Sequence, residues 1–181
     1  SNRAGWDGGG AFLTRGGLVE DCTFVANRAD GSSYGGGGLC LRYTGTVRRT
    51  VICSNVSFMS AGGVYAYVGR IENCTIRSNA ASWNAGGVYV DGGTCIRESV
   101  VEYNSSSLGG GGILCYNGST VLNCRVVGNY IGNDFGAGIY MYQNANFVIN
   151  CTVVSNRTGA SGQGGGVYTH TAACYLQNSI V

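Results

Sequence analysis

Residues 62–90 read GGVYAYVGRIENCTIRSNAASWNAGGVYV and contain one complete unit of a repeat that runs through the chain. The motif Gly-Gly-Val-Tyr opens this stretch and returns at residues 86–89. Between the two copies, apolar and polar residues alternate in short runs, which is the pattern of β-strands with one buried face. A repeat of this length, rich in glycine and β-branched residues, predicts a solenoid in which each unit forms one coil.

An asparagine after a β-rich run marks every unit of the repeat. These asparagines are Asn2, Asn27, Asn55, Asn79, Asn104, Asn129 and Asn156. With coils starting at residues 1, 26, 54, 78, 103, 128 and 155, residues 1–181 form a single domain of seven coils. The predicted fold is all-β: a single-stranded right-handed parallel β-helix with three short parallel sheets and no capping helix. Stacked side-chain amides hydrogen-bond from coil to coil in such folds, so we expect a structural asparagine ladder.

The positions expected to face the core are apolar in every coil. The first such column contains Ala11, Leu39, Val64, Val88, Ile113, Ile139 and Val167. Two later inward columns, one containing Val121 and the other Cys124, lie three residues apart in the sequence. This spacing breaks strict alternation and requires a bend in the chain between them. Asparagine or aspartate, which tolerate left-handed geometry, precede this bend in most coils. We therefore expect two longer strands and a short third strand in each coil, with Val88, Ile113 and Val126 buried.

Composition argues against several classes of partner. The eleven arginines are scattered and form no clustered basic face, so no nucleic-acid partner is expected. No apolar run reaches the length of a membrane span, so no membrane insertion is expected. Nine cysteines without a Cys-x-x-Cys motif predict neither a metal site of the usual spacing nor a cofactor.

One column of small residues contains four of the cysteines. Cys124 and Cys151 occupy it on consecutive coils, at a separation that permits a disulfide. Thr50, Ser99 and Ser179 take the same place in other coils, which favours a slot for small residues instead. Both interpretations remain open from the sequence.

Two motifs resemble those of a known family. Gly-Gly-Ala-Phe at residues 9–12 and Phe-Val-Ala-Asn at residues 24–27 resemble the paired motifs of chlamydial polymorphic membrane proteins and their bacterial β-helix relatives. The resemblance implies a right-handed parallel β-helix that is secreted or displayed on a cell surface and often acts in adhesion. We therefore expect an extracellular or cell-surface location.

The outward positions of the first strand in each coil are rich in tyrosine. They include Tyr65, Tyr67, Tyr89, Tyr116, Tyr140, Tyr142 and Tyr168. Alternation places these side chains on the outer surface of one sheet. Aromatic packing between neighbouring strands explains such a set. An exposed apolar patch of this kind also marks a binding or lateral-contact face, and the two interpretations weigh equally.

The carboxylates show no arrangement typical of a polysaccharide-cleaving enzyme. Glycoside hydrolysis needs two acids converging on one bond. Glu20 and Glu72 fall in one outward column, but they lie two coils apart with Arg48 between them. We therefore predict no catalytic residues and no enzymatic activity, with a polysaccharide lyase or hydrolase as the distant alternative.

The main functional hypothesis is an extracellular structural solenoid. Neither end of the chain shows an amphipathic helix, a proline or a charged coil of the kind that caps solenoids. The expected partner is therefore a second copy, bound head to tail through the end coils to form a fibre or surface layer. A covalent continuation of the same repeat, in a longer chain, is equally compatible with the match between the two ends. The alternative is an adhesin passenger segment that binds a glycan or a host surface protein through the tyrosines.

Overall fold

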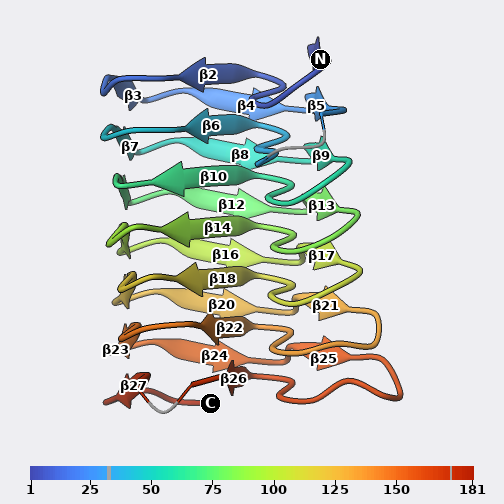
Figure 1. Ribbon diagram of the computed structural model, residues 1–181, viewed down its shortest axis with the longest axis vertical. Helices are drawn as coiled ribbons and strands as arrows, with labels where there is room; N and C mark the ends of the chain where they lie inside the picture. Colours follow the sequence, from blue (N-terminus) through green and yellow to red (C-terminus); the bar gives the residue numbers. More distant parts are fainter. Residues whose placement is uncertain (32–33, 172) are drawn as a thin grey trace.

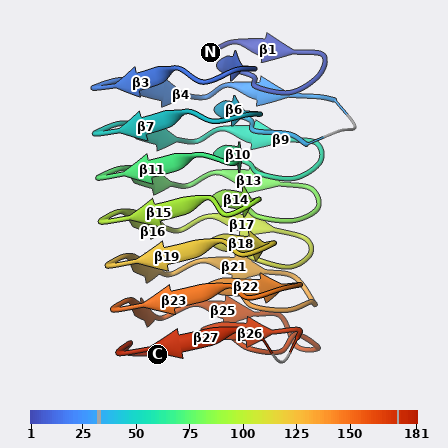
Figure 2. The same ribbon diagram turned by 60° about the vertical axis from the view of Figure 1, so that its left-hand side comes forward.

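A computed structural model describes residues 1–31, 34–171 and 173–181. Over these residues the chain forms 27 short β-strands and no helix. Figure 1 shows seven coils stacked along the long axis of a rod, with the N-terminus at one end and the C-terminus at the other. The 60° turn in Figure 2 shows that strands of successive coils lie directly under one another.

Each coil contributes strands to sheets that run the length of the rod, here named A to D in the order in which the chain visits them. Sheet A contains β1 (Arg3–Ala4), β5 (Arg28–Ala29), β9 (Val56–Ser57), β13 (Ala80–Ala81), β17 (Ser105–Ser106), β21 (Tyr130–Ile131) and β25 (Arg157–Thr158). Sheet B contains β2 (Ala11–Leu13), β6 (Leu39–Leu41), β10 (Val64–Tyr67), β14 (Val88–Asp91), β18 (Ile113–Tyr116), β22 (Ile139–Tyr142) and β26 (Val167–Thr169).

The remaining two sheets complete each coil. Sheet C contains β3 (Leu18–Glu20), β7 (Thr46–Arg48), β11 (Arg70–Glu72), β15 (Cys95–Arg97), β19 (Thr120–Leu122), β23 (Phe147–Ile149) and β27 (Tyr175–Gln177). Sheet D contains β4 (Thr23–Val25), β8 (Val51–Cys53), β12 (Thr75–Arg77), β16 (Val100–Glu102), β20 (Arg125–Val127) and β24 (Thr152–Val154). All neighbouring strands pair in parallel, and Val64, for example, pairs with Leu39 on one side and Val88 on the other.

The structure has four parallel sheets, whereas the sequence predicted three. The additional sheet is A, whose strands follow the ladder asparagines directly and contain only two residues each. A two-residue strand is too short to show an alternating pattern. Its residues also differ widely between coils, from Arg3–Ala4 to Tyr130–Ile131. Sheet A is therefore recognised only from hydrogen bonding between coils.

The core fills the space enclosed by the sheets. Val88, Ile113 and Val126 are fully buried, which confirms the predicted inward columns. In the last coil, two members of the inward columns are exposed, with 45% of Leu176 and 60% of Val181 accessible. A solenoid coil obtains its apolar cover from the coils on either side, so these members of the last coil, which has one described neighbour, are more accessible than their counterparts in the inner coils.

Left-handed residues form the corners between the strands. The corner between sheets C and D has positive φ in Asp21, Arg49, Asn73, Glu98, Asn123, Asn150 and Asn178, with values of 47–53°. The bend predicted from asparagine and aspartate is thus confirmed, and Arg49 and Glu98 adopt it as well. A second left-handed corner, before the ladder asparagines, was missed because the residue type varies there, and Ala26 and Tyr103 are not typical of turns.

Candidate functional site

The seven ladder asparagines form one column at the corner between sheets D and A. The backbone N–H and the Nδ2 of Asn55 both donate to Oδ1 of Asn79, at 2.9 and 3.0 Å. Asn79 repeats this pattern toward Asn104, and its Nδ2 also donates to the carbonyl of Ile52 at 3.0 Å. The ladder side chains from Asn27 to Asn129 are buried. Their amides are consumed by bonds between coils, which is a structural role.

The small-residue column forms a second polar ladder at the opposite corner. The N–H of Cys74 donates to Oγ of Ser99 at 3.1 Å, and the N–H of Cys124 donates to Sγ of Cys151 at 3.5 Å. The thiol of Cys151 donates in turn to the carbonyl of Ile149, two residues earlier. All nine cysteines lie among the described residues and carry free thiols, so no disulfide joins Cys124 and Cys151. Contact with Cys151, together with burial, raises the pKa of the Cys124 thiol.

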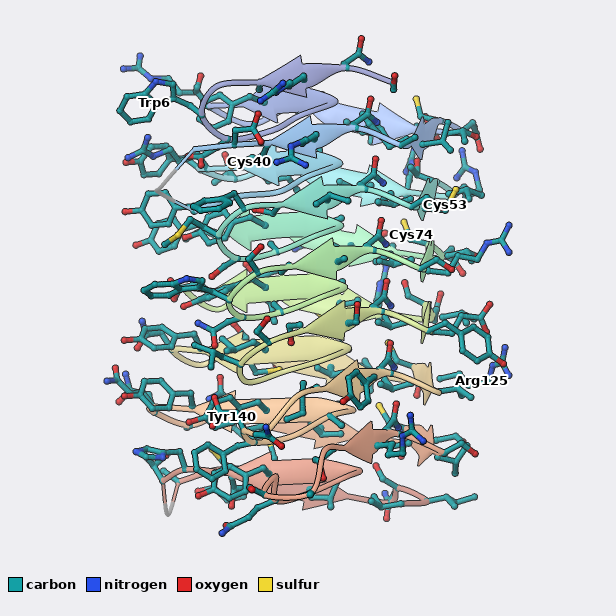
Figure 3. The ribbon with its side chains drawn as sticks, turned by 90° about the vertical axis from the view of Figure 1, so that its right-hand side faces the viewer. Trp6, Cys40, Cys53, Cys74, Arg125 and Tyr140 are labelled. Atoms are coloured by element: carbon teal, nitrogen blue, oxygen red, sulfur yellow. The ribbon has the colours of Figure 1, made fainter. Side chains whose placement is uncertain are left out.

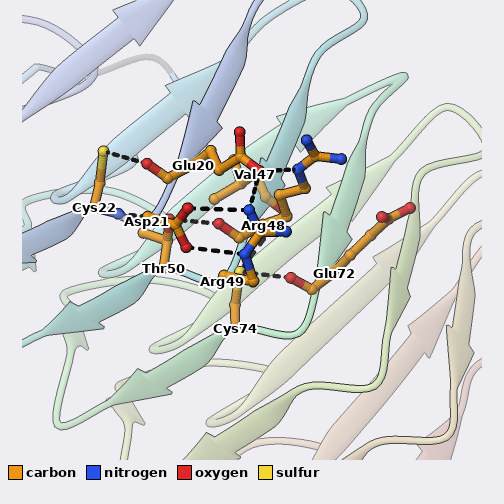
Figure 4. A network of polar contacts seen from close by, with 9 residues as sticks. All are labelled: Glu20, Asp21, Cys22, Val47, Arg48, Arg49, Thr50, Glu72 and Cys74. Carbon is orange, nitrogen blue, oxygen red and sulfur yellow. Dashed lines mark hydrogen bonds and ion pairs between the residues drawn. The ribbon is translucent and has the colours of Figure 1, made fainter.

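The acids of sheet C pair with arginines on neighbouring coils. Residues 20, 48, 72 and 97 share one outward column, in which glutamate and arginine alternate. Arg48 Nε lies 2.7 Å from Glu20, and Arg97 lies 3.1 Å from Glu72. Figure 4 shows Glu20 and Asp21 beside Arg48 and Arg49, and Arg49 pairs with both acids. The Arg48 hydrogen bond holds the pKa of Glu20 below its usual value, and such exposed pairs contribute little to stability.

All seven predicted tyrosines lie on the outer face of sheet B. Tyr65 pairs with Tyr89 across β10 and β14, and Tyr116 pairs with Tyr142 across β18 and β22. Neighbouring rings also touch along the rod. The centroid distances are 5.3 Å for Tyr65–Tyr89, 6.2 Å for Tyr89–Tyr116 and 5.5 Å for Tyr116–Tyr142. These rings form a continuous aromatic strip, here called the tyrosine face.

Part of the tyrosine face is covered by loops that connect sheets A and B. Only 3% of Tyr65 and 7% of Tyr140 are exposed, although both side chains point away from the main core. The ring of Tyr34 lies 4.9 Å from that of Tyr65, and the ring of Phe135 lies 6.1 Å from that of Tyr140. Sequence reasoning missed Tyr34 and Phe135 because their loops differ in length from coil to coil.

One of these loops needs glycine to reach the face. A Cβ atom at position 109 would collide with the ring of Tyr140. The N–H of Gly109 donates to a carboxylate oxygen of Asp134 at 3.0 Å, which ties the loops of two consecutive coils together. Trp6 lies in the loop between sheets A and B of the first coil. In Figure 3, Trp6 and Arg125 lie at opposite edges of the rod.

The face and its loops enclose two open hollows. The first has a volume of about 240 Å³ and is lined by Tyr34, Arg42, Tyr43, Tyr65, Tyr67 and Asp91. The second has a volume of about 310 Å³ and is lined by Asn84, Tyr89, Leu114, Tyr116, Asp134, Phe135, Tyr140 and Tyr142. Both combine aromatic walls with a few polar groups, which is the usual composition of a small-molecule site.

The polar groups of the hollows are held in place. The guanidinium of Arg42 lies over the ring of Tyr34, 5.2 Å from its centroid. A carboxylate oxygen of Asp91 accepts from Nδ2 of Asn117 at 3.0 Å. Burial raises the pKa of Tyr140 to about 12, and burial also raises the pKa values of Tyr65 and Tyr89. These tyrosines therefore keep neutral hydroxyl groups well above neutral pH.

Comparison with protein families identifies the fold. Residues 9–181 match the family model described as a right handed beta helix region. The chain belongs to this right-handed β-helix family. Comparisons with curated proteins and with solved structures find no match. The narrower resemblance to chlamydial polymorphic membrane proteins stays a prediction.

Membership of the β-helix family establishes the handedness of the coils and leaves the activity open, because this fold serves both enzymes and non-enzymes. Among the described residues, no group of three or more histidine, cysteine or carboxylate side chains is arranged to hold a metal ion. The same residues include no helix long and apolar enough to cross a bilayer. The two hollows on the tyrosine face, which combine aromatic rings with polar groups, are the candidate functional site of this β-helix.

Proposed function

We propose that this chain is a non-catalytic structural β-solenoid of the cell surface or extracellular space, and that copies stack end to end. The observation that carries the proposal is the regular continuation of buried columns from coil to coil, which a coil of a second copy would extend at the C-terminal end of the rod. Leu176 continues a column that is buried at Val148 in the preceding coil, and Val181 continues a column that is buried at Val153. Stacking a further coil on this end would remove their apolar surface from water.

The asparagine ladder supports the same arrangement. The ladder asparagines from Asn2 to Asn129 each donate to Oδ1 of the asparagine in the next coil, as Asn129 does to Asn156. Asn2 of a following copy would occupy the next place in the column, within about one residue of the repeat. A head-to-tail contact of this kind does not close on itself and produces a fibre. Each copy would add roughly 34 Å, which is seven coil spacings.

Electron microscopy and sedimentation of the purified chain test this proposal. We expect rods that lengthen as the protein concentration rises. The double substitution Leu176→Arg and Val181→Arg places charges on the end coil and should yield monomers. Val56→Arg is the matched control, because Val56 is 37% exposed on the side of the rod, and this variant should still assemble. A chain that remains monomeric at every concentration, or rods that form equally well in the double variant, would overturn end-to-end stacking.

The absence of catalysis has its own test. Incubation with pectin and other acidic polysaccharides should give no cleavage products, with or without divalent cations. Turnover that disappears on replacing Glu72 or Asp91 would overturn the non-catalytic part of the proposal. Stacking would be unaffected by that result, because neither side chain belongs to an end coil.

A second candidate function is adhesion through the tyrosine face, which the two hollows favour. The test is retention of labelled chain on surfaces coated with polysaccharides or with extracellular proteins. Tyr89→Ala should reduce retention. Tyr175→Ala should not, because Tyr175 stacks on Phe147 in sheet C, outside the tyrosine face. Equal retention of both variants would count against adhesion through this face.

A further inference from the structure

The two hollows are parts of one continuous surface. Strand β14 contributes Asp91 to the first hollow and Tyr89 to the second, and the ring of Tyr89 contacts that of Tyr65 in the first. The lining runs from Arg42, directly after β6, to Tyr142 on β22. These positions are four coil spacings apart, or about 19 Å. A ligand that fills both hollows is therefore elongated and lies along the axis of the rod.

The lining matches the chemistry of sugars. A pyranose ring has apolar C–H faces, which pack on aromatic rings, and hydroxyl groups around its edge, which need hydrogen-bond partners. Tyr67, Tyr116 and Tyr142 are half-buried, so part of each ring remains accessible. Asp91, Asp134 and the amide of Asn84 supply acceptors and donors beside these rings.

Charge narrows the class of sugar. The linings contain one arginine and two aspartates, so their formal charges sum to −1. The guanidinium of Arg42 is already engaged with the ring of Tyr34. A polymer that carries a carboxylate on each sugar would meet like charge at Asp91 and Asp134. A neutral polymer meets no such repulsion.

The arrangement of the strands disfavours a peptide ligand. Peptides commonly bind to sheets by adding a strand to a free edge. The strands under the hollows, from β6 to β22, already have a parallel neighbour on each side. A peptide on this face would be held by side chains alone.

We propose that the tyrosine face binds a neutral, linear polysaccharide that runs along the solenoid axis and occupies both hollows. This inference rests on the second candidate function and names its ligand. Tyr89 and Tyr65 form the junction between the two parts of the site. Affinity therefore grows with the length of the oligosaccharide until both hollows are filled.

Calorimetric titration with defined oligosaccharides tests the inference. The probes are cellohexaose, mannohexaose, xylohexaose and the fully N-acetylated chitohexaose, their disaccharides, and hexagalacturonate. At least one neutral hexasaccharide should bind more than about tenfold tighter than its disaccharide. Tyr89→Ala and Tyr142→Ala should each weaken that binding about tenfold, whereas Tyr175→Ala should leave it unchanged. Thermal unfolding by circular dichroism shows which variants are folded. Because two variants alter the tyrosine face, the test can still be made if one of them does not fold.

The outcomes of these experiments distinguish failure of the proposed glycan ligand from failure of the proposed adhesion function. Binding of hexagalacturonate alone, equal affinity for hexasaccharide and disaccharide, or loss of binding in Tyr175→Ala would each overturn the inference. Retention on protein-coated surfaces that depends on Tyr89, without binding of any neutral hexasaccharide, would refute the glycan ligand and leave adhesion standing. Absence of Tyr89-dependent retention on every surface, together with no glycan binding, would refute both.

Discussion

The two halves of each coil differ in how much their length varies from coil to coil. From sheet C through sheet D to the ladder asparagine the spacing is constant, so Asn27 follows Val19 by eight residues, and all of the first six coils repeat this spacing. From the ladder asparagine to the first inward residue of sheet B the spacing varies. It is nine residues from Asn55 to Val64, but twelve from Asn27 to Leu39.

The difference reflects what each half contains. The constant half holds both polar ladders and two core columns, so an added residue would turn buried side chains outward and break the ladder bonds. The variable half contains the loops between sheets A and B, where insertions are tolerated. These loops supply Tyr34, Asp134 and Phe135 to the two hollows. The chain thus keeps its fold in one half of the coil and varies its surface chemistry in the other.

A charge placed in each half should separate them most clearly. Val126→Asp buries a carboxylate in the constant half without a partner and should prevent folding, because that cost is comparable to the roughly 5–15 kcal/mol stability of a whole domain. Leu108→Asp makes the same change in a loop of the variable half, where the side chain is 40% exposed, and should fold. Expression of soluble protein and circular dichroism check both. A cooperatively folded Val126→Asp variant would contradict the assigned core.

Removal of one ladder amide should have the next largest effect. Asn79→Ala takes away the acceptor for two donors of Asn55 in a buried site and should cost about 3 kcal/mol. Asn2→Ala is the matched control at the open end of the same column. It should cost less than about 1 kcal/mol, because Asn2 is exposed and only donates within the ladder. Chemical denaturation measures the free energy of unfolding of both variants. Equal losses of stability would argue against a stabilising role of the buried amides.

Alkaline pH should weaken the tyrosine face before it affects the ladders. Folding raises the pKa values of Tyr65, Tyr89 and Tyr140, so the folded chain holds these protons more tightly than the unfolded chain. Their contribution is complete below about pH 10, the unfolded value, and is lost as pH rises toward 12 and above. Denaturation at several pH values, together with tyrosinate absorbance, follows the loss. In Tyr140→Phe the decline should be shallower, and an unchanged decline would contradict the assignment.

The smallest expected effect is a gain in stability within the constant half. Glu98 adopts a left-handed conformation, with φ of 51°, where four other coils place asparagine. Glu98→Asn should therefore stabilise the chain by about 1 kcal/mol. Glu98→Gln removes the charge and keeps a long side chain, so it should give no gain of this origin. Thermal unfolding of the two variants distinguishes strain from charge, and an equal gain in both would point to charge.

Much of the constant half is readable from the sequence, because its apolar columns and asparagines recur at fixed spacing. Tyr65, Tyr89 and Tyr140 could also be assigned to one outer face, since alternation along a strand decides which side a residue takes. Their burial could not be predicted. It depends on Tyr34 and Phe135, which come from loops that follow no repeat.

The sequence by itself determined that the chain forms seven stacked coils and which residues face the core, because a periodic pattern constrains local backbone and side-chain direction together. Only the tertiary structure decided that there are four sheets, that the N–H of Cys124 donates to Sγ of Cys151, and that the tyrosine face is divided into two hollows. These features depend on distances between residues about 25 positions apart or more, in different coils. Such distances follow from the stacking of coils, and no local pattern encodes them.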